Sequence, residues 1–396
     1  MMNILHISPY YPSLETNHAG GVCMGKEIES LEKNNNVYIL TFAASAYDRK
    51  LALSENKKNC KYVVIYKWNR MLHVLFEPFM PSYFAARTSF RYAVKLIYYM
   101  KKYKIEAIHA EYASMGQYIC LIKKLFPRVK VYLVEHDVTI QSYERKRDSS
   151  TGFLRGYYAW ECRKIKKHES RYCRAADMVL TFNEKDRDLL KRVYHIDHIQ
   201  VINPYFGISD ELLIPGKARY SEYANICFLG QMGREENHLA AKRLIRIGDK
   251  VKEQIPELNI YIIGNQPSEE LKKEKNDFVH VTGFVEDVDE YLKKAQLAVF
   301  PLSLGAGIKV KVLRSLAHGI PVITGKVGAE GIDEEGSVIT LAETDEEYAQ
   351  NIIHLIKDEK RCLELSRLSR EYIKDKFSWG KSEEILRRLY ITPHMR

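Results

Sequence analysis

The chain has 396 residues, which is enough for two or three domains with a core in each. Its apolar content of 46% and charged content of 28% are ordinary for a globular protein, and no apolar run approaches the roughly 18 residues of a membrane span. The formal net charge of +10 indicates an anionic partner, either nucleic acid, anionic lipid or a phosphorylated substrate, unless the protein is simply basic.

The seven cysteines are scattered and form no CxxC pair, which argues against a disulfide framework or a zinc site. This cysteine usage favours a reducing, cytoplasmic location. The first residues, MMNILHIS, lack the basic leader and the long apolar region of a signal peptide, and we interpret them as a β-strand.

Short apolar runs alternate with helical patterns along the first half of the chain. The predicted strands are residues 3–7, 37–42, 62–66, 107–110, 130–134, 178–181 and 199–202. This alternation predicts a doubly wound parallel α/β sheet, in which a ligand binds outside the carboxyl ends of the strands.

Two adjacent glycines, Gly20 and Gly21, follow the first strand, just before a helix predicted to begin near Val22. Adjacent glycines exceed what a strand-to-helix turn needs. We therefore predict a loop that approaches either the phosphate of a donor substrate or the acceptor substrate. An ordinary turn is the alternative.

Residues 61–104 hold nine Lys or Arg against one acid, with twelve aromatic residues interleaved. Residues 142–174 repeat this pattern more weakly. Helical spacing predicts a core-facing stripe of Phe90, Ala93, Val94, Ile97 and Met100. A basic face flanked by aromatic residues favours contact with an anionic membrane surface. A solvated basic helix face is the alternative.

The strand predicted at 130–134 is followed by Glu135-His136-Asp137. A histidine beside a carboxylate at the carboxyl end of a strand can position a sugar hydroxyl or shuttle a proton, so His136 and Asp137 are catalytic candidates. The alternative is a helix-capping aspartate with an incidental histidine.

Residues 206–222 are interpreted as a linker between a first domain (1–205) and a second domain (223–377), with a final helix (378–396) that packs back on the first domain. The second domain again alternates, with strands predicted at 225–229, 259–263, 279–282, 297–300, 321–324 and 337–341. Its helices are predicted at 237–253, 268–275, 287–294, 308–318 and 344–357. Two such domains imply a ligand cleft between them.

Glycine loops follow several of these strands. Gly230 allows close approach of a ligand, and Arg234 is placed to reach a phosphate. The loop Gly283-Phe284-Val285 offers main-chain groups to a nucleobase edge.

The segment 305–314 combines glycines, a helix start and lysines. Gly305 and Gly307 permit a tight turn, and the N-terminus of the following helix collects an anion. Lys309 and Lys311 in the first turn oppose the helix dipole, so we expect an anionic ligand to compensate. We interpret the loop as the diphosphate site of a nucleotide-sugar enzyme.

These motifs together resemble the retaining GT-B glycosyltransferases related to glycogen synthase and bacterial glycosyltransferase group 1. The matching motifs are HISPYYP with the paired glycines, EHD at 135–137, AADMVLTFNEKD at 175–186, FLGQM followed by an asparagine within 228–237, VTGFVEDV at 281–288, and PLSLGAGIKVKVL to GAEGI within 301–332. The last motif is similar to a subgroup common in bacterial surface-polysaccharide assembly. The resemblance covers nearly the whole chain and implies two Rossmann-like domains facing across a cleft.

Site roles follow from this resemblance. It implies that His136 meets the donor sugar, that Gly20-Gly21 lies near the diphosphate and acceptor, and that Lys309 and Lys311 lie near the diphosphate. The loop 283–285 resembles the base-binding loop. The implied reaction moves a hexose from a UDP- or GDP-sugar to a lipid-linked glycan with retention, without an obligate metal, in a cytoplasmic protein peripheral to the inner face of the membrane.

One position departs from the family pattern. The family usually carries two glutamates eight positions apart, the later one holding the ribose hydroxyls, and here these positions are Ala306 and Arg314. A guanidinium has no acceptor for a hydroxyl proton but can contact a phosphate bidentately. Either the donor binds in a modified way, or the chain is a non-catalytic partner subunit of a glycosyltransferase complex. A nucleic-acid binder is a third reading, without any recognised motif.

Overall fold

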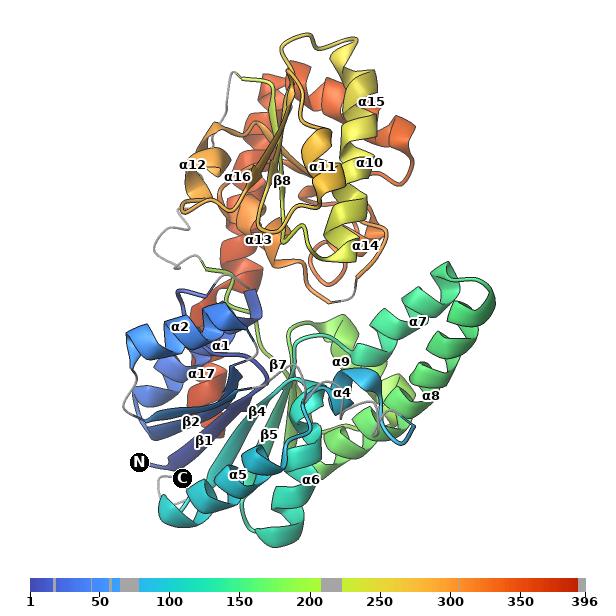
Figure 1. Cartoon of the computed structure of the whole chain (residues 1–396). Helices are drawn as coiled ribbons and strands as arrows, with labels where there is room; N and C mark the ends of the chain where they lie inside the picture. Colours follow the sequence, from blue (N-terminus) through green and yellow to red (C-terminus); the bar gives the residue numbers. More distant parts are fainter. Residues whose placement is uncertain are drawn as a thin grey trace. The chain divides into compact units, whose positions relative to one another are not determined.

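The computed structural model describes residues 1–16, 19–43, 45–56, 59–64, 78–207, 223–305 and 307–390 (Figure 1). The chain forms two compact units: unit 1 contains residues 1–207 and 379–396, and unit 2 contains residues 208–378. Ala306, residues 208–222 of the predicted linker and residues 65–77 of the basic segment lie outside the described residues.

Unit 1 contains a seven-stranded parallel sheet in the order β3-β2-β1-β4-β5-β6-β7. Its strands are β1 (Asn3–Ser8), β2 (Asn36–Ala43), β3 (Cys60–Val64), β4 (Ala107–Glu111), β5 (Lys130–Glu135), β6 (Met178–Thr181) and β7 (Ile199–Val201). Its helices are α1 (Ala19–Glu32), α2 (Ala46–Glu55), α4 (Ser82–Ala85), α5 (Phe90–Lys102), η1 (Ala113–Met115), α6 (Gly116–Leu125), α7 (Thr139–Ser149), α8 (Gly152–Ala175), α9 (Glu184–Tyr194) and α17 (Trp379–Leu389). The strand order reverses between β1 and β4, so a ligand crevice is expected at their carboxyl ends.

Unit 2 contains a six-stranded parallel sheet in the order β10-β9-β8-β11-β12-β13. Its strands are β8 (Asn225–Leu229), β9 (Asn259–Ile263), β10 (Val279–Gly283), β11 (Leu297–Phe300), β12 (Val322–Thr324) and β13 (Ile339–Leu341). Its helices are α10 (Glu235–Lys252), α11 (Glu269–Lys273), α12 (Asp289–Lys294), α13 (Val310–Ala317), α14 (Lys326–Ala329), α15 (Asp345–Lys357) and α16 (Glu359–Phe377). Here the order reverses between β8 and β11. The predicted pair of doubly wound parallel sheets is therefore confirmed.

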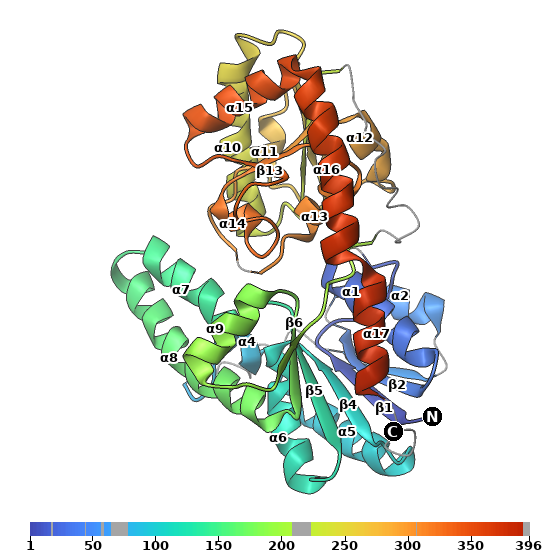
Figure 2. The ribbon, with the colours of Figure 1, turned by 180° about the vertical axis from the view of Figure 1, so that it is seen from behind.

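The last helix, α17, completes the core of unit 1, where it packs beside α1 (Figure 2). Trp379 Nε1 donates to Ser30 Oγ (3.1 Å), and Asn203 N donates to Ser382 Oγ (2.6 Å). Tyr390, which follows α17, is also buried. Residues from the end of the chain therefore lie against α1, near the start of the chain, and against the segment that follows β7.

The core-facing stripe predicted for α5 is confirmed for Met100 and wrong for Phe90 and Val94, which are exposed. Its buried residues are Tyr92, Leu96, Tyr99 and Met100, whereas the side chain of Phe90 is 84% exposed. Tyrosine explains the error, because its ring packs like an apolar residue while its hydroxyl takes a polar partner. The Tyr92 hydroxyl donates to Leu40 O (2.5 Å) inside the core. The exposed face of α5 is therefore both apolar and basic.

Candidate functional site

His136 lies directly after β5, and its ring contacts two aromatic side chains and a carboxylate. Tyr112 stacks on it with ring centroids 3.8 Å apart and planes 11° apart, and Phe182 meets it edge-on at 4.7 Å. The Nε2 atom of His136 lies 2.8 Å from Glu111 Oε2. Tyr112 has a φ of 67°, a left-handed conformation that is strained for a residue with a side chain and is often found at functional sites. The ring of His136 therefore has a defined orientation.

Gly20 brings the first turn of α1 against this histidine. A β-carbon at Gly20 would lie 2.0 Å from Tyr112 Oη and 3.6 Å from His136 Nδ1, so any side chain there would displace the Tyr112 hydroxyl. Gly21 is buried in the same turn, and its carbonyl accepts a hydrogen bond from Ser13 N (3.1 Å). The helix begins at Ala19, so both predicted glycines lie inside its first turn rather than in the preceding loop.

Asp137 occupies the turn between β5 and α7 and is partly buried. The first amide groups of α7 are bound by another carboxylate, since Thr139 N and Ile140 N donate to Glu169 (2.8 and 3.3 Å). The structure thus places Asp137 beside His136 in the chain, at the carboxyl edge of the sheet.

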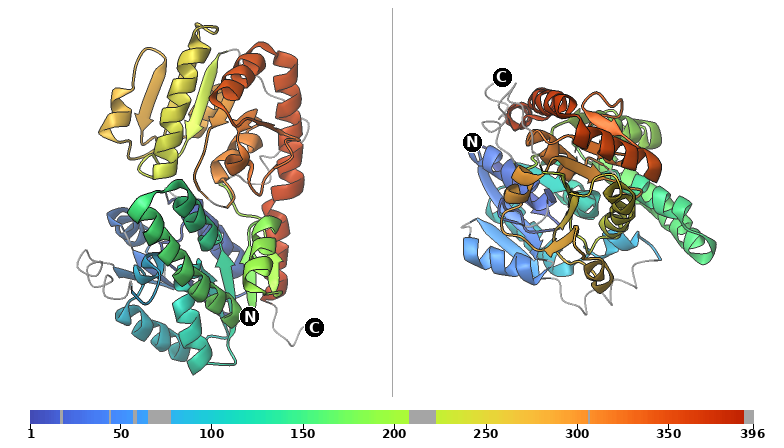
Figure 3. Two further views of the ribbon diagram at one scale, coloured as in Figure 1. Left: turned by 90° about the vertical axis from the view of Figure 1, so that its right-hand side faces the viewer. Right: turned by 90° about the horizontal axis from the view of Figure 1, so that it is seen from above.

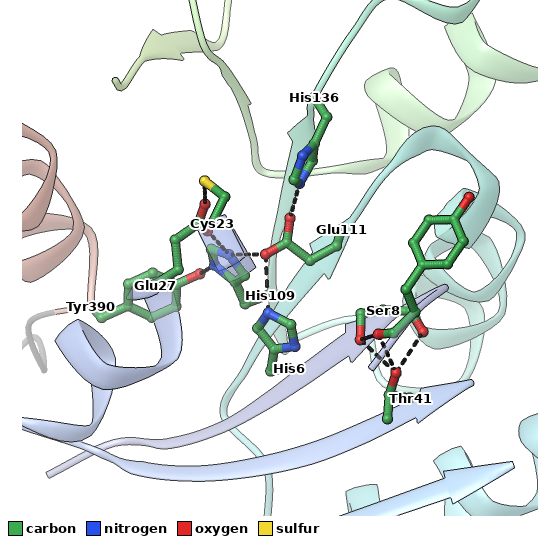
Figure 4. Close-up of polar contacts among 10 residues, drawn as sticks. His6, Ser8, Cys23, Glu27, Thr41, His109, Glu111, His136 and Tyr390 are labelled. Carbon is green, nitrogen blue, oxygen red and sulfur yellow. Dashed lines mark hydrogen bonds and ion pairs between the residues drawn. The ribbon is translucent and has the colours of Figure 1, made fainter. Parts of the chain in front are cut away.

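A buried polar network lies beneath His136 (Figure 4). Glu111 Oε2 contacts His136, while Glu111 Oε1 lies 3.0 Å from His6 Nε2 and 3.1 Å from His109 Nε2. The three partners of Glu111 lie in the carboxyl-terminal half of β1, in β4 and directly after β5, around the reversal of strand order. Glu111 is therefore surrounded by three imidazoles.

The network continues away from His136 through His109. Its Nε2 lies 2.7 Å from Glu27 Oε2, and its Nδ1 lies 2.6 Å from Tyr390 Oη. Burial opposes a charge on His109, but the hydrogen bonds to Glu111 and Glu27 outweigh it and raise the pKa of His109 to about 10. Burial also disfavours the ionised form of Glu111, yet the three histidines hold the pKa of Glu111 well below its usual range. At neutral pH an imidazolium therefore lies beside an ionised Glu111.

Three of these residues also have the donor types of a metal site, because ligand atoms of His6, His109 and Glu111 all lie within 4.8 Å of one another. The two rings, however, stack with centroids 5.2 Å apart and planes 18° apart. Both Nε2 atoms also lie within hydrogen-bond distance of the same carboxylate oxygen, Glu111 Oε1 (3.0 and 3.1 Å). This geometry favours the hydrogen-bonded network, and the absence of an obligate metal stays a prediction.

In unit 2 the glycine loops that follow β8, β9 and β10 meet one another. A β-carbon at Gly264 would lie 1.7 Å from Gly230 O, and Gly264 N donates to Gly283 O (3.1 Å). Gly283 has a φ of 72°, which favours glycine. Beyond it Phe284 is exposed and Val285 is partly buried, so this loop offers an aromatic side chain to solvent.

Lys311 is a lysine of unit 2 whose pKa is strongly lowered. Its Nζ donates to Asn237 Oδ1 (2.5 Å) and lies 4.6 Å from the centroid of the Phe228 ring. Burial, reinforced by the charge of Lys309, lowers the pKa of Lys311 to about 7. Asn237 also fills the space beside Gly230, where a β-carbon would lie 2.8 Å from its amide. Two predicted loops are thus joined through Asn237.

The loop before α13 has the predicted backbone. Gly305 and Gly307 have φ values of 115° and 67°, which side chains rarely adopt. Lys309 flanks the helix, donates to Gly307 O (2.5 Å) and lies 3.7 Å from the buried Glu330. The helix itself is Val310–Ala317, two residues later at its start than predicted.

Arg314 forms an ion pair that sequence reasoning missed. Its Nη2 donates to Asp289 Oδ1 (2.6 Å), and His318 Nε2 lies 3.3 Å from the same oxygen. His318 together with Arg314 holds the pKa of Asp289 well below its usual range. Arg234, by contrast, is exposed and pairs with Glu236 (3.1 Å).

The residues missed from the sequence are Glu27, His109, Glu111, Tyr112, Asn237 and Asp289. One signal was present in the sequence: polar His109 and Glu111 alternate in an otherwise apolar strand, and a buried polar pair in a strand demands partners. The partners themselves are distant in sequence and carried no such signal.

Comparison with known proteins agrees with this architecture. A family model described as "Glycosyltransferase Family 4" matches residues 29–205, and one described as "Glycosyl transferases group 1" matches residues 224–358. A protein described as "Uncharacterized 44.6 kDa protein in cps region" of Klebsiella pneumoniae is 23% identical over 322 residues, covering 76% of this chain and 77% of that protein.

Solved structures share the fold over almost the whole chain. Sucrose-phosphate synthase from Thermosynechococcus elongatus is 16% identical, with a TM-score of 0.73 and 98% of each chain covered. Anabaena Alr3699/HepE in complex with UDP is 14% identical, with a TM-score of 0.69 over 98% of this chain and 99% of that one. A mutant of S. aureus TarM, in complex with fondaparinux, alpha-GlcNAc-glycerol and UDP, is 11% identical, with a TM-score of 0.69 over 99% of this chain and 100% of that one.

The two family models together span most of the chain, one in each unit, and the structural neighbours share both units. The chain is therefore a glycosyltransferase of the GT-B fold.

Proposed function

We propose that this glycosyltransferase moves a hexose from a UDP- or GDP-sugar, with retention, to a lipid-linked glycan in surface-polysaccharide assembly. The observation that carries the proposal is the cationic glycine loop of unit 2. There Lys311 has a lowered pKa and a neutral hydrogen-bond partner, and the helix that begins at Val310 has no side-chain hydrogen bond capping its N-terminus. An anion bound at this loop provides a charged partner for Lys311 and a hydrogen-bond acceptor for the N-terminus of the helix.

The chemistry assigned to this loop is stabilisation of a leaving group. As the bond between the sugar and the diphosphate breaks, negative charge grows on the diphosphate, and Lys309 and Lys311 neutralise it. His136, in unit 1, orients a sugar hydroxyl or moves its proton. The solved relatives HepE and TarM were both crystallised with UDP, which supports a nucleotide diphosphate here.

The direct test is calorimetric titration of the purified chain with UDP and GDP, followed by transfer assays with the corresponding hexose donors. We expect one nucleotide to bind with a Kd in the micromolar to millimolar range. A folded protein that binds neither nucleotide contradicts the proposal.

The surface-polysaccharide role is supported by the relative from a cps region. Contact with an anionic membrane is supported by two exposed apolar and basic surfaces of unit 1. On α5, Phe90, Val94 and Tyr98 are exposed at four-residue spacing. At the tip of the α7–α8 hairpin, which projects from the rest of unit 1 (Figures 1 and 3), Phe153 is 88% and Leu154 56% exposed.

Basic residues surround both surfaces. Arg91, Lys95, Lys101 and Lys102 are exposed on α5, and Arg155 is exposed beside Phe153. Within the part of the chain that the structure describes, no helix is long and apolar enough to cross a membrane. We therefore propose peripheral binding to the inner face of the membrane, in which aromatic rings enter the interface and lysines contact anionic headgroups.

Flotation with liposomes tests this contact. The protein should float with vesicles that contain anionic lipid and should be released at about 1 M salt, where the Debye length is about 3 Å. Flotation that is independent of lipid charge contradicts an electrostatic contact.

The second candidate function is a non-catalytic partner subunit, and Arg314 motivates it. The ion pair with Asp289 weakens this alternative, because Arg314 already has a carboxylate partner inside unit 2. Changing Arg314 to Glu separates the two functions. Transferase activity that appears only in Arg314→Glu would identify the native chain as a scaffold.

A further inference from the structure

We propose that Glu111 is the positioning residue of His136: it fixes the imidazole tautomer with the proton on Nε2 and leaves Nδ1 as the atom that faces the substrate. This inference rests on the proposed function in assigning a substrate to His136. The tautomer itself follows from contacts within unit 1 and is testable without any substrate.

The argument for the tautomer begins with the charge of Glu111. An ionised carboxylate only accepts hydrogen bonds, so every ring nitrogen that points at it carries a proton. Glu111 Oε2 lies 2.8 Å from His136 Nε2, the distance of a charge-assisted hydrogen bond. In the neutral ring the single proton is then on Nε2, and Nδ1 keeps its lone pair.

The direction of Nδ1 follows from what encloses the ring. Tyr112 stacks on one face, Phe182 makes a T-shaped contact, and Glu111 contacts Nε2. The side chain is only 8% exposed. Nδ1 faces the position where a β-carbon of Gly20 would stand, 3.6 Å away. The Tyr112 hydroxyl lies 2.0 Å from the same position, so the absence of a side chain at Gly20 lets this hydroxyl and the acceptor nitrogen of His136 lie at the first turn of α1.

The rest of the network keeps Glu111 ionised. His109 donates toward Glu111 from Nε2, and its Nδ1 contacts Tyr390 Oη at 2.6 Å. Tyr390 comes from the end of the chain, 281 residues from His109. A chain of hydrogen bonds from Tyr390 through His109 and Glu111 to His136 therefore couples the packing of the C-terminal residues to the tautomer of His136 (Figure 4).

The first measurement uses the unchanged protein. Nitrogen-15 NMR of histidine-labelled full-length chain, with His136 assigned by His136→Asn, should show the Nε2-protonated tautomer at pH 8. A spectrum with the proton on Nδ1 overturns the proposal, whatever the fate of the nucleotide-sugar assignment.

The second measurement compares two isosteric substitutions of buried glutamates. Glu111→Gln removes the charge that faces His136. The matched control is Glu135→Gln, since Glu135 is buried at the end of the next strand but accepts from Ala113 N (3.2 Å). Burial and the nearby Glu169 raise the pKa of Glu135 well above its usual range, so glutamine resembles its protonated form.

We expect Glu111→Gln to give a mixture of His136 tautomers and to lower kcat by about 100-fold or more, within the range of general acid–base effects. The KM for the donor should change less than threefold, and Glu135→Gln should keep both the tautomer and kcat. Equal losses in both variants, or an unchanged tautomer in Glu111→Gln, overturn the proposal. Absence of nucleotide binding in the unchanged protein instead refutes the proposed function and leaves the tautomer result standing.

Discussion

Replacing Lys311 with Met tests whether the cationic loop exists for a ligand rather than for the fold. Lys311 lies over the Phe228 ring and donates to Asn237, but burial and Lys309 lower its pKa to about 7. Methionine has a similar length, packs well against an aromatic ring and carries no charge. The substitution therefore removes the cation and leaves the packing.

Two effects of opposite sign follow. A hydrogen bond from a charged group contributes about 1.5–3 kcal/mol, so affinity for UDP or GDP should fall about tenfold to a hundredfold. Without nucleotide, the fold no longer holds a poorly solvated cation. Even after the loss of the Asn237 hydrogen bond, the free energy of unfolding should rise by about 1–2 kcal/mol.

The gain in the free energy of unfolding should depend on pH, because the protonation of Lys311 differs between the folded and unfolded states. The pKa of Lys311 is lower in the fold than its ordinary value of 10.5, so between those values the unfolded chain binds more protons. The destabilisation is fully present below about pH 7 and disappears as the pH rises toward 10.5. The gain in Lys311→Met should therefore be larger at pH 6.5 than at pH 9.5.

Urea unfolding at both pH values and calorimetric titration with nucleotide measure these effects. Lys252→Met is a matched control, because Lys252 also lies over an aromatic ring and donates one hydrogen bond. Its Nζ lies 5.1 Å from the centroid of the Phe278 ring and donates to Leu258 O (3.0 Å). This control should keep the nucleotide affinity and gain no stability. A Lys311→Met variant that is less stable, or that binds nucleotide as tightly as the native chain, would refute the reasoning.

Three further predictions concern unit 1. Gly20→Ala should reduce transfer at least tenfold, because its β-carbon would collide with the Tyr112 hydroxyl, whereas Gly156→Ala in α8, with no atom within 4 Å, should leave kcat unchanged and slightly stabilise the protein. The raised pKa of His109 contributes stability that is fully present below about pH 6.5 and is lost as the pH rises through about 10, so His109→Gln should flatten the unfolding free energy between these values; a variant with the native pH profile contradicts the assignment. Phe153→Ser should weaken flotation with anionic liposomes while leaving nucleotide affinity unchanged, and undiminished flotation would remove the α7–α8 tip from the proposed contact.

The fold was predictable because its signals are local. The strands at 178–181, 225–229, 259–263 and 297–300 have the predicted bounds, since a strand buried on both faces is a continuous apolar run between polar or turn residues. The glycine loop at 305–307 was equally visible, because few residues other than glycine adopt its φ values. Helix faces were less predictable, and on α5 the amphipathic tyrosines shift the buried face away from the predicted stripe, of which Met100 is buried.

The electrostatics of the site were not predictable in the same way. His136 was identified from its place after a strand, but its partner Glu111 lies 25 residues earlier. The stacking residue Tyr112 has a positive φ, which no sequence pattern predicts. Which polar residues share a buried space depends on strand order, since β1 and β4 are neighbours in the sheet although β2 and β3 lie between them in the chain. The network emerges only from the tertiary structure.

Arg314 illustrates how such a partner changes the interpretation of a single residue. In the sequence, a guanidinium stands where an acid is expected, and the position has lost its acceptor. In the structure, Asp289 at the start of α12 lies against Arg314, and both Arg314 and His318 approach the same oxygen, Oδ1. The Asp289 side chain is still 35% exposed, so a strongly ionised carboxylate remains at this edge of unit 2. The presence of arginine in place of the expected glutamate therefore moves the carboxylate acceptor to the neighbouring helix α12 instead of removing it. For this reason we expect Asp289→Asn to impair nucleotide binding more than Arg314→Gln does, and the reverse order would return Arg314 to the role of a phosphate ligand.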